Sequence, residues 1–305
     1  MNAPLPTSIP GYLDQLRRAL AGADSAMIHD ALHDAEEYLR SELADNPGKS
    51  EAEVIAAVAS SYGAPDEVAE IYRDTEVTVQ RALRPPVPRA RSGMQAPGWL
   101  RRVFGVFSDP RTYGALFYML LALATGIFYF TWTVTGASLS LGLSVLIIGL
   151  PFLLLFLGAS RVLSLVEGRI VEVMLGERMP RRVAYQDKDR PWLKRIGDMF
   201  ADPRTWSTFL YFMLMLPLGI IYFTTTVALL SSGLALTVAP LLAAIGAHDQ
   251  WQVSVWGIDL ITYHPWVSLL FVPVGIAVIV ATFHLARAIG RMHGHLAKAL
   301  LVKGD

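Results

Sequence analysis

The chain has 305 residues, of which 53% are hydrophobic, and it contains no cysteine, which excludes disulfides, thiolate catalysis and thiolate metal ligands. Lys+Arg and Asp+Glu both number 26, so the formal net charge is zero. The charge is unevenly distributed along the chain. Residues 11–76 hold 15 acids and 5 bases, whereas the remainder holds 11 acids and 21 bases.

Residues 1–76 are predicted to form a small acidic helical domain. Apolar residues recur at helical spacing, and the breaks between helices fall at Gly22, Asn46-Pro47-Gly48 and Gly63. Three helix starts carry local signals, namely Asp24 or Ser25 as an N-cap, Ser50 with Glu53 as a capping box, and Pro65 in a first turn. The first ten residues lack the basic and apolar regions of a signal peptide, so we expect this domain in the cytoplasm.

This four-helix pattern carries one specific run, Tyr62-Gly63-Ala64-Pro65-Asp66-Glu67-Val68-Ala69, after an acidic second helix and a first stripe of Tyr12, Leu13, Leu16 and Leu20. On these residues the segment resembles the HAAS signalling domain. The resemblance implies the cytoplasmic head of a membrane protein, of the kind often paired with PadR-like transcription regulators. In chemical terms the run from Tyr62 to Pro65 is a joint between two helices.

Residues 77–100 are interpreted as a linker to a membrane domain. Prolines interrupt any continuous helix in this segment, and arginines give it positive charge. A solvated tether is one interpretation. Adhesion to anionic headgroups, worth about 1 kcal/mol per basic residue, is the alternative.

The membrane domain contains an internal repeat. Residues 107–135 and 200–228 align at a constant offset of 93, with 15 identities in 29 positions. Each copy opens with Asp-Pro-Arg-Thr and continues for more than 20 residues without a charge, about what a helix needs to cross a bilayer. We therefore predict a duplicated membrane domain, with one repeat in residues 101–199, including an amphipathic helix on the cytoplasmic side, and another in residues 200–305.

Four spans are predicted, at about 113–135, 138–160, 206–230 and 266–289. Basic residues precede the first span, occur ten times in the loop 161–204 and follow the last span, whereas the connections 131–138 and 231–265 have none. The positive-inside rule then places both termini in the cytoplasm, and two spans per repeat make the repeats parallel. Residues 234–247 are also apolar, and we interpret them as re-entrant, interfacial or a long outer end of span three, with a break at Pro240. The predicted fold class is thus all-α, a small helical domain plus a four-span bundle with an outward insertion at about 231–265.

The membrane domain as a whole resembles the sensor domain that is fused to histidine kinases in some bacteria. The resemblance is carried by Phe107-Ser108-Asp109-Pro110-Arg111-Thr112, by Gly149-Leu150-Pro151, and by the helix that continues through Arg161 and Glu167. It implies a sensor function. Since no nucleotide-binding loop or phosphoacceptor domain is found in this chain, we expect its output to be a contact with another protein.

The Asp-Pro-Arg-Thr run at 109–112 is called the first box, and the run at 202–205 the second box. Their charged residues supply the first candidate site: Asp109, Arg111, Asp202 and Arg204. One interpretation is structural, with aspartate as a helix cap, proline in the first turn and arginine at the headgroups. The other is a signalling role, in which Asp109 pairs with Arg204, and Asp202 with Arg111, across the two repeats.

Two further groups of residues are candidates. Tyr118, Tyr129, Tyr211 and Tyr222 form a polar stripe inside the spans, which favours interhelical packing and hydrogen bonds, with a small apolar or lipid ligand as the alternative. An outer-loop sensing group consists of His248, Asp249, Asp259 and His264, whose spacing matches no standard metal site, so no metal is predicted. His284, His293 and His295 are expected to be interfacial or solvated.

Function follows mainly by exclusion. The first three spans contain no ionisable acid, base or histidine at depth, which disfavours ion-coupled transport, and no nucleophile with a base is evident, so neither an enzyme nor a cofactor is predicted. The leading hypothesis is a sensor in the bacterial cytoplasmic (inner) membrane. Its predicted partners are membrane lipid and a cytoplasmic protein such as a PadR-like regulator. The acidic domain should not bind nucleic acid directly, and a homo-oligomer is left open. The alternative is a lipid- or small-molecule-handling protein, such as an exporter subunit or scaffold.

Overall fold

The computed structural model describes residues 5–83, 98, 103–143, 149–180, 197, 199–245, 254–255, 258–259 and 269–302. The chain divides into two compact units. The first unit comprises Met1–Arg84, Thr133–Tyr211 and Gly294–Asp305, and the second comprises Pro85–Trp132 and Phe212–His293. Three long helices contribute to both units, and each unit is considered by itself below.

The all-helical prediction with four spans is confirmed. Among the described residues, four helices are long and apolar enough to cross a membrane: α6 (Pro110–Leu143), α7 (Gly149–Leu175), α9 (Pro203–Ala244) and α12 (Phe271–Leu301). The 3₁₀ turn η1 (Gly105–Ser108) precedes α6. The described strands are the two-residue β1 (Ser254–Val255) and β2 (Ile258–Asp259), which pair antiparallel. The sides on which the termini lie stay a prediction.

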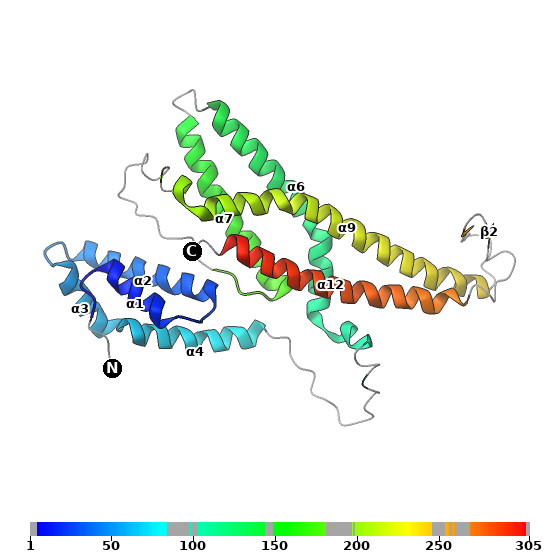
Figure 1. Cartoon of the computed structure of the whole chain (residues 1–305), viewed down its shortest axis with the longest axis horizontal. Helices are drawn as coiled ribbons and strands as arrows, with labels where there is room; N and C mark the ends of the chain where they lie inside the picture. Colours follow the sequence, from blue (N-terminus) through cyan, green and yellow to red (C-terminus); the bar gives the residue numbers. More distant parts are fainter. Residues whose placement is uncertain are drawn as a thin grey trace. The chain divides into compact units, whose positions relative to one another are not determined.

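The N-terminal domain in the first unit contains α1 (Ile9–Ala19), α2 (Ser25–Asp45), α3 (Glu51–Ser61) and α4 (Pro65–Leu83). In Figure 1 these are the blue to cyan helices, and α1 packs against both α2 and α4. Their starts follow the predicted signals, since Asp24 caps α2, and Ser50 with Glu53 forms the capping box of α3. Local side-chain chemistry therefore sets where these helices begin.

One apolar core holds the N-terminal domain together. The largest fully buried side chains in it come from α1, α2 and α3 and from the turn after α1: Tyr12, Leu16, Leu20, Leu39 and Ile55. Removing such side chains from water contributes about 1.5–3 kcal/mol each, which lets a domain of this size hold four short helices.

The joint between α3 and α4 depends on a glycine. Gly63 has φ +114°, a conformation that costs an L residue, and its carbonyl accepts a hydrogen bond of 2.8 Å from the Tyr12 hydroxyl. The Tyr72 hydroxyl on α4 donates to Asp34 Oδ2 at 2.8 Å on α2. Burial raises the pKa of both tyrosines above the ordinary value. The joint predicted from sequence is thus fixed by a buried phenol.

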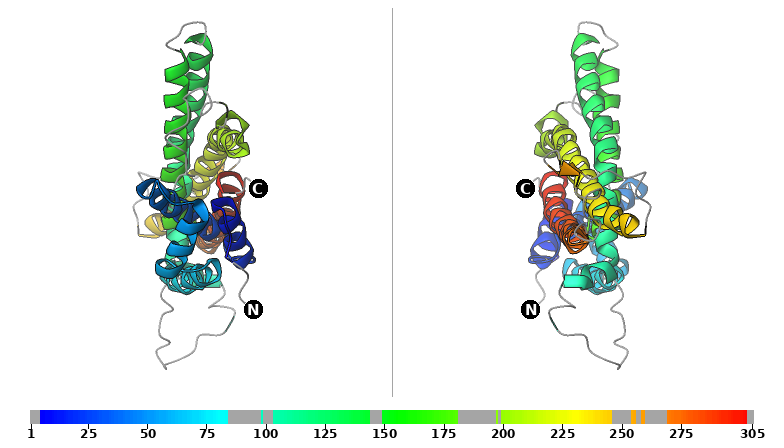
Figure 2. Two further views of the ribbon diagram at one scale, coloured as in Figure 1. Left: turned by 90° about the vertical axis from the view of Figure 1, so that its left-hand side faces the viewer. Right: turned by 90° about the vertical axis from the view of Figure 1, so that its right-hand side faces the viewer.

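The membrane helices of the first unit form a hairpin. The end of α6 and the start of α7 lie side by side (Figures 1 and 2). Gly136 of α6 leaves room for the ring of Phe156 of α7, because a Cβ at this position would lie 2.1 Å from a ring carbon. Phe156 in turn stacks on Phe209 of α9 at a centroid distance of 5.4 Å. Small residues at such crossings let apolar helices approach closely without water.

In the second unit α6 and α9 cross at two glycines. A Cβ on Gly126 would lie 2.4 Å from the Met215 carbonyl oxygen, and one on Gly219 would lie 2.3 Å from that of Ala122. These positions correspond at the offset of 93, so the contact is reciprocal. A twofold relation between two copies generates contacts of this kind. Further along, α9 packs against α12 through Gly233 and Gly275.

One expectation for the spans is corrected, namely the helix break at Pro240. Residues 234–244 continue α9 as one helix, which agrees with the interpretation of this segment as an extension of span three, and Pro240 does not break it. Proline removes one backbone hydrogen bond, and a 42-residue apolar helix that also contains Pro217 continues through such losses. The stretch with Glu167 is part of α7, in agreement with the sequence prediction of a helix that continues through Arg161 and Glu167.

Candidate functional site

The second box begins α9 and is firmly held within the first unit. Asp202 accepts the backbone N–H of Arg204 on Oδ1 at 3.0 Å, and its Oδ2 pairs with Arg161 Nη2 of α7 at 2.8 Å. The hydroxyl of Thr205 donates to the Met199 carbonyl at 2.7 Å. Asp202 therefore caps its helix and also binds a neighbouring span.

The first box has the same arrangement in the second unit. Asp109 accepts the backbone N–H of Arg111 on Oδ1 at 3.1 Å, and its Oδ2 lies 3.3 Å from Arg287 Nη2 of α12. In both boxes the aromatic residue that follows the threonine donates a hydrogen bond to the carbonyl six residues before it. Tyr113 donates to the Phe107 carbonyl at 2.9 Å. Trp206 makes the equivalent bond to Phe200, also at 2.9 Å.

Each box thus pairs with the second span of the other repeat. Asp109 begins the first repeat and binds Arg287 of the second, whereas Asp202 begins the second repeat and binds Arg161 of the first. We call this the crossed pairing. The pairs proposed from sequence, Asp109 with Arg204 and Asp202 with Arg111, join residues of different units and stay a prediction.

A second crossed contact lies nine residues after each aspartate. In the first unit the Tyr211 hydroxyl donates to Glu167 Oε1 at 2.9 Å. In the second unit the Tyr118 hydroxyl and His293 Nε2 are 2.6 Å apart. Glu167 follows Arg161 by six residues, as His293 follows Arg287, so both contacts repeat with the same spacing.

The four predicted tyrosines are all buried. Tyr222 also reaches His293, with its hydroxyl 3.3 Å from Nδ1, and Tyr129 stacks on Phe212 at 4.6 Å. These contacts agree with the packing and hydrogen-bonding interpretation of the stripe. The prediction for His293 was wrong, because this side chain is fully buried rather than interfacial or solvated.

The N-terminal domain binds the ends of the membrane helices through three basic residues. Arg178, just after α7, lies 3.3 Å from Asp30 of α2, 3.3 Å from Glu76 of α4 and 3.6 Å from Glu172 of α7. Lys298 of α12 pairs with Asp24, the cap of α2. Arg204 of α9 lies 3.1 Å from His29 Nδ1 of α2 through its Nη1. Its Nη2 also donates to the Val302 carbonyl at 3.0 Å, just after α12. We call these contacts the docking contacts, and all lie within the first unit.

The contacts of Arg178 are the most buried of the three. Arg178, Asp30, Glu76 and Glu172 each expose 9% or less of their surface. Arg169 adds a second cation on Glu172, so three carboxylates face two guanidiniums. Removing one partner from a buried group of this kind leaves uncompensated charge, which typically costs 3–5 kcal/mol. No local sequence pattern marks the docking role of Arg178, because its partners on the N-terminal domain, Asp30 and Glu76, lie 148 and 102 residues away.

A small cavity lies beside the second box, with a volume of about 60 Å³. Its wall includes Arg161, Asp202 and Arg204, with His29 from the N-terminal domain. Apolar and hydroxyl side chains, most of them from α7 and α9, complete the wall.

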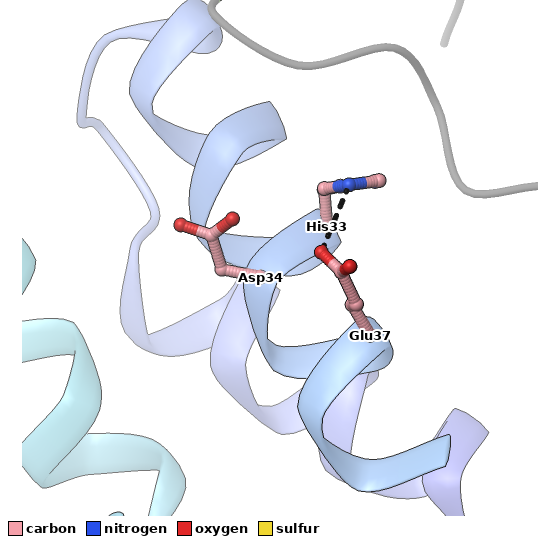
Figure 3. A group of neighbouring side chains, drawn as sticks. All are labelled: His33, Asp34 and Glu37. Atoms are coloured by element: carbon pink, nitrogen blue, oxygen red, sulfur yellow. Dashed lines mark ion pairs between the residues drawn. The ribbon is translucent and has the colours of Figure 1, made fainter. Parts of the chain in front are cut away.

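Of the four outer-loop candidates, Asp259 lies within the part of the chain that the structure describes. Asp259 lies in β2, opposite Ser254, and His248, Asp249 and His264 lie outside the described residues. Figure 3 shows a group of metal-ligand type on α2, where His33 and Glu37 are 3.6 Å apart and Asp34 lies beside them. Since Asp34 already accepts the Tyr72 hydroxyl, packing of α2 on α4 explains this residue.

Comparison with known families now decides the identity of the membrane domain. A family model described as "Putative sensor" matches residues 118–301, more than half of the chain. The chain belongs to this family. With its four apolar helices it is a multi-pass membrane sensor protein, and the resemblance noted for the membrane domain is confirmed. Comparisons with curated proteins and with solved structures gave no match.

Proposed function

We propose that this sensor protein signals by releasing its acidic N-terminal domain from the docking contacts to a cytoplasmic protein partner. The observation that carries the proposal is the burial of Asp30 and Glu76 against Arg178. These carboxylates are bound to the membrane helices in one state and would be exposed in another. A change in the helix bundle that moves the end of α7 would therefore change what the domain offers to a partner.

The chemistry of the domain indicates the kind of partner. Residues 11–76 carry a net charge of −10, which favours a basic protein surface and disfavours nucleic acid. A PadR-like transcription regulator has such a surface where it binds DNA, and the resemblance of residues 1–76 to the HAAS domain supports this choice. The partner would compete with Arg178 for the same carboxylates.

The free energy of docking determines how strongly it reduces the partner's apparent affinity. If docking is favoured by about 3 kcal/mol, the domain is free in fewer than one molecule in a hundred, and the partner's apparent affinity falls by the same factor. A stimulus that weakens docking restores that affinity without any catalytic step. This mechanism accords with the prediction that the chain is not an enzyme.

The alternative, a lipid- or small-molecule-handling protein, receives less support. The cavity beside the second box, at about 60 Å³, is far below the roughly 300–1,000 Å³ of ordinary ligand pockets. A neighbouring gene for a small regulator would favour sensing, and one for an ATPase would favour transport.

The direct test uses the full chain in lipid nanodiscs and a purified PadR-like regulator from the same organism. Arg178→Met should raise the regulator's affinity by at least tenfold, because it frees the acidic domain. Arg40→Met is the matched control, since Arg40 pairs with Glu36 on the surface of the same domain. Equal affinities for wild type and Arg178→Met, or no binding by either, would reject the proposal.

A further inference from the structure

The cavity beside the second box is built differently from an ordinary packing defect. Its apolar part is formed by side chains such as Leu157 and Phe209. Its polar part carries the guanidiniums of Arg161 and Arg204, the carboxylate of Asp202 and several serine and threonine hydroxyls. Apolar voids stay dry, but a cavity with charged walls holds water or a polar ligand. The two guanidiniums at this cavity favour the binding of an anion.

The charge balance leaves one cation in excess. Both oxygens of Asp202 are engaged, one by the N–H of Arg204 and the other by Arg161 Nη2. This carboxylate neutralises one guanidinium and caps α9, so the helix end itself is already satisfied. Within the described residues, the Nε and Nη1 donors of Arg161 make no hydrogen bond, and they remain for a ligand.

Size and donor chemistry narrow the ligand class. The volume of about 60 Å³ exceeds the roughly 10–15 Å³ needed for one water and is too small for a drug-sized molecule. Guanidinium forks bind phosphate oxygens in pairs and with directional hydrogen bonds. We infer that this cavity binds a phosphate group, supplied either by a lipid headgroup or by free inorganic phosphate, between Arg161 and Arg204.

A ligand here would act on the docking contacts, and this consequence rests on the proposed function. The cavity wall combines α7 and α9 with His29 of the N-terminal domain, and Arg204 joins His29 directly. A phosphate group in the cavity therefore binds the docked state better than a state in which α2 has left. By linkage, it favours docking to the extent of that difference in affinity.

The test measures binding without any partner protein. The full chain is placed in nanodiscs of phosphatidylcholine and titrated with inorganic phosphate by ³¹P NMR. In a second arm, thermal unfolding is compared between nanodiscs with and without phosphatidylglycerol. Arg161→Gln should weaken phosphate binding at least tenfold or abolish the rise in Tm given by phosphatidylglycerol. Arg287→Gln is the matched control, since it breaks the equivalent pair with Asp109 and does not line the cavity.

The outcomes separate the sources and the proposals. Binding of free phosphate with no lipid effect identifies inorganic phosphate, and a Tm rise that only phosphatidylglycerol gives identifies a lipid headgroup. Absence of both effects in the wild type, or equal losses in Arg161→Gln and Arg287→Gln, would overturn the inference. If Arg161→Gln does not fold, Ser164→Leu fills the cavity without removing charge and should abolish the same effects. Phosphate binding without any regulator binding would reject the proposed function alone.

Discussion

Replacing Arg178 by methionine should release the N-terminal domain from the membrane helices. The arginine lies among Asp30, Glu76 and Glu172, and all four residues expose 9% or less of their surface. Methionine keeps much of the volume and removes the charge, which leaves three carboxylates with Arg169 as their nearby cation. The carboxylates can regain water only if the domain moves away.

The expected size follows from burial. Breaking a buried ion pair typically costs 3–5 kcal/mol, whereas an exposed pair is worth about 0–1 kcal/mol. Since about 1.4 kcal/mol is tenfold, the docking equilibrium constant should fall by at least about a hundredfold. Arg40→Met, which breaks the more exposed pair with Glu36, should change it less than about fivefold.

Spin-label distances can measure docking, because the chain has no cysteine of its own. Labels on Ser41→Cys of α2 and Val173→Cys of α7, both exposed, report the separation within the first unit. Wild type should give one narrow distance distribution, and Arg178→Met a broad one with unchanged helix content by circular dichroism. A narrow distribution in Arg178→Met, or an equal broadening in Arg40→Met, would refute the reasoning.

Three further outcomes are expected. Gly126→Ala should weaken the α6–α9 crossing by about 1–3 kcal/mol in a Tm measurement, because its Cβ would lie 2.4 Å from the Met215 carbonyl oxygen, while Gly142→Ala, with open space around it, should not. Above about pH 10 the N-terminal domain should lose stability, because burial raises the pKa of Tyr12, so the folded state resists a deprotonation that the unfolded state accepts. Tyr12→Phe should reduce this alkaline loss in a urea titration. A cysteine at Ser232 should be labelled from the outer side of the membrane only, and labelling from the cytoplasmic side alone would reject the four-span topology.

The helices of the N-terminal domain were predictable because their starts depend on neighbours in the sequence. The Ser50–Glu53 capping box and the turn at Gly63 each involve residues within a few positions. The span count was predictable for a similar reason, since a long uncharged run needs no partner to be recognised. Helix ends were less predictable, because α12 continues to Leu301 past Arg287 and Arg291, where charge indicated an end.

The partners of the candidate residues could not be predicted. The sequence indicates that Asp202 caps a helix, but its second oxygen binds Arg161, one of ten bases between residues 161 and 204. Nothing in the local pattern distinguishes that base from the others. His293 was misassigned for the same reason, since its burial depends on Tyr118 and Tyr222, 175 and 71 residues away.

The crossed pairing bears on how such a protein arose and how it can be divided. Neither half of the membrane domain contains the arginine that binds its own box aspartate, because Asp109 uses Arg287 and Asp202 uses Arg161. A two-span ancestor would have satisfied this pair only as a dimer of two identical chains, each lending its second span to the other. Duplication and fusion of the gene would then make this exchange of spans permanent and allow the copies to diverge, with Glu167 in one and His293 in the other. If the chain is cut between α7 and α9, the two fragments should accordingly assemble into a folded membrane domain only when both are produced together.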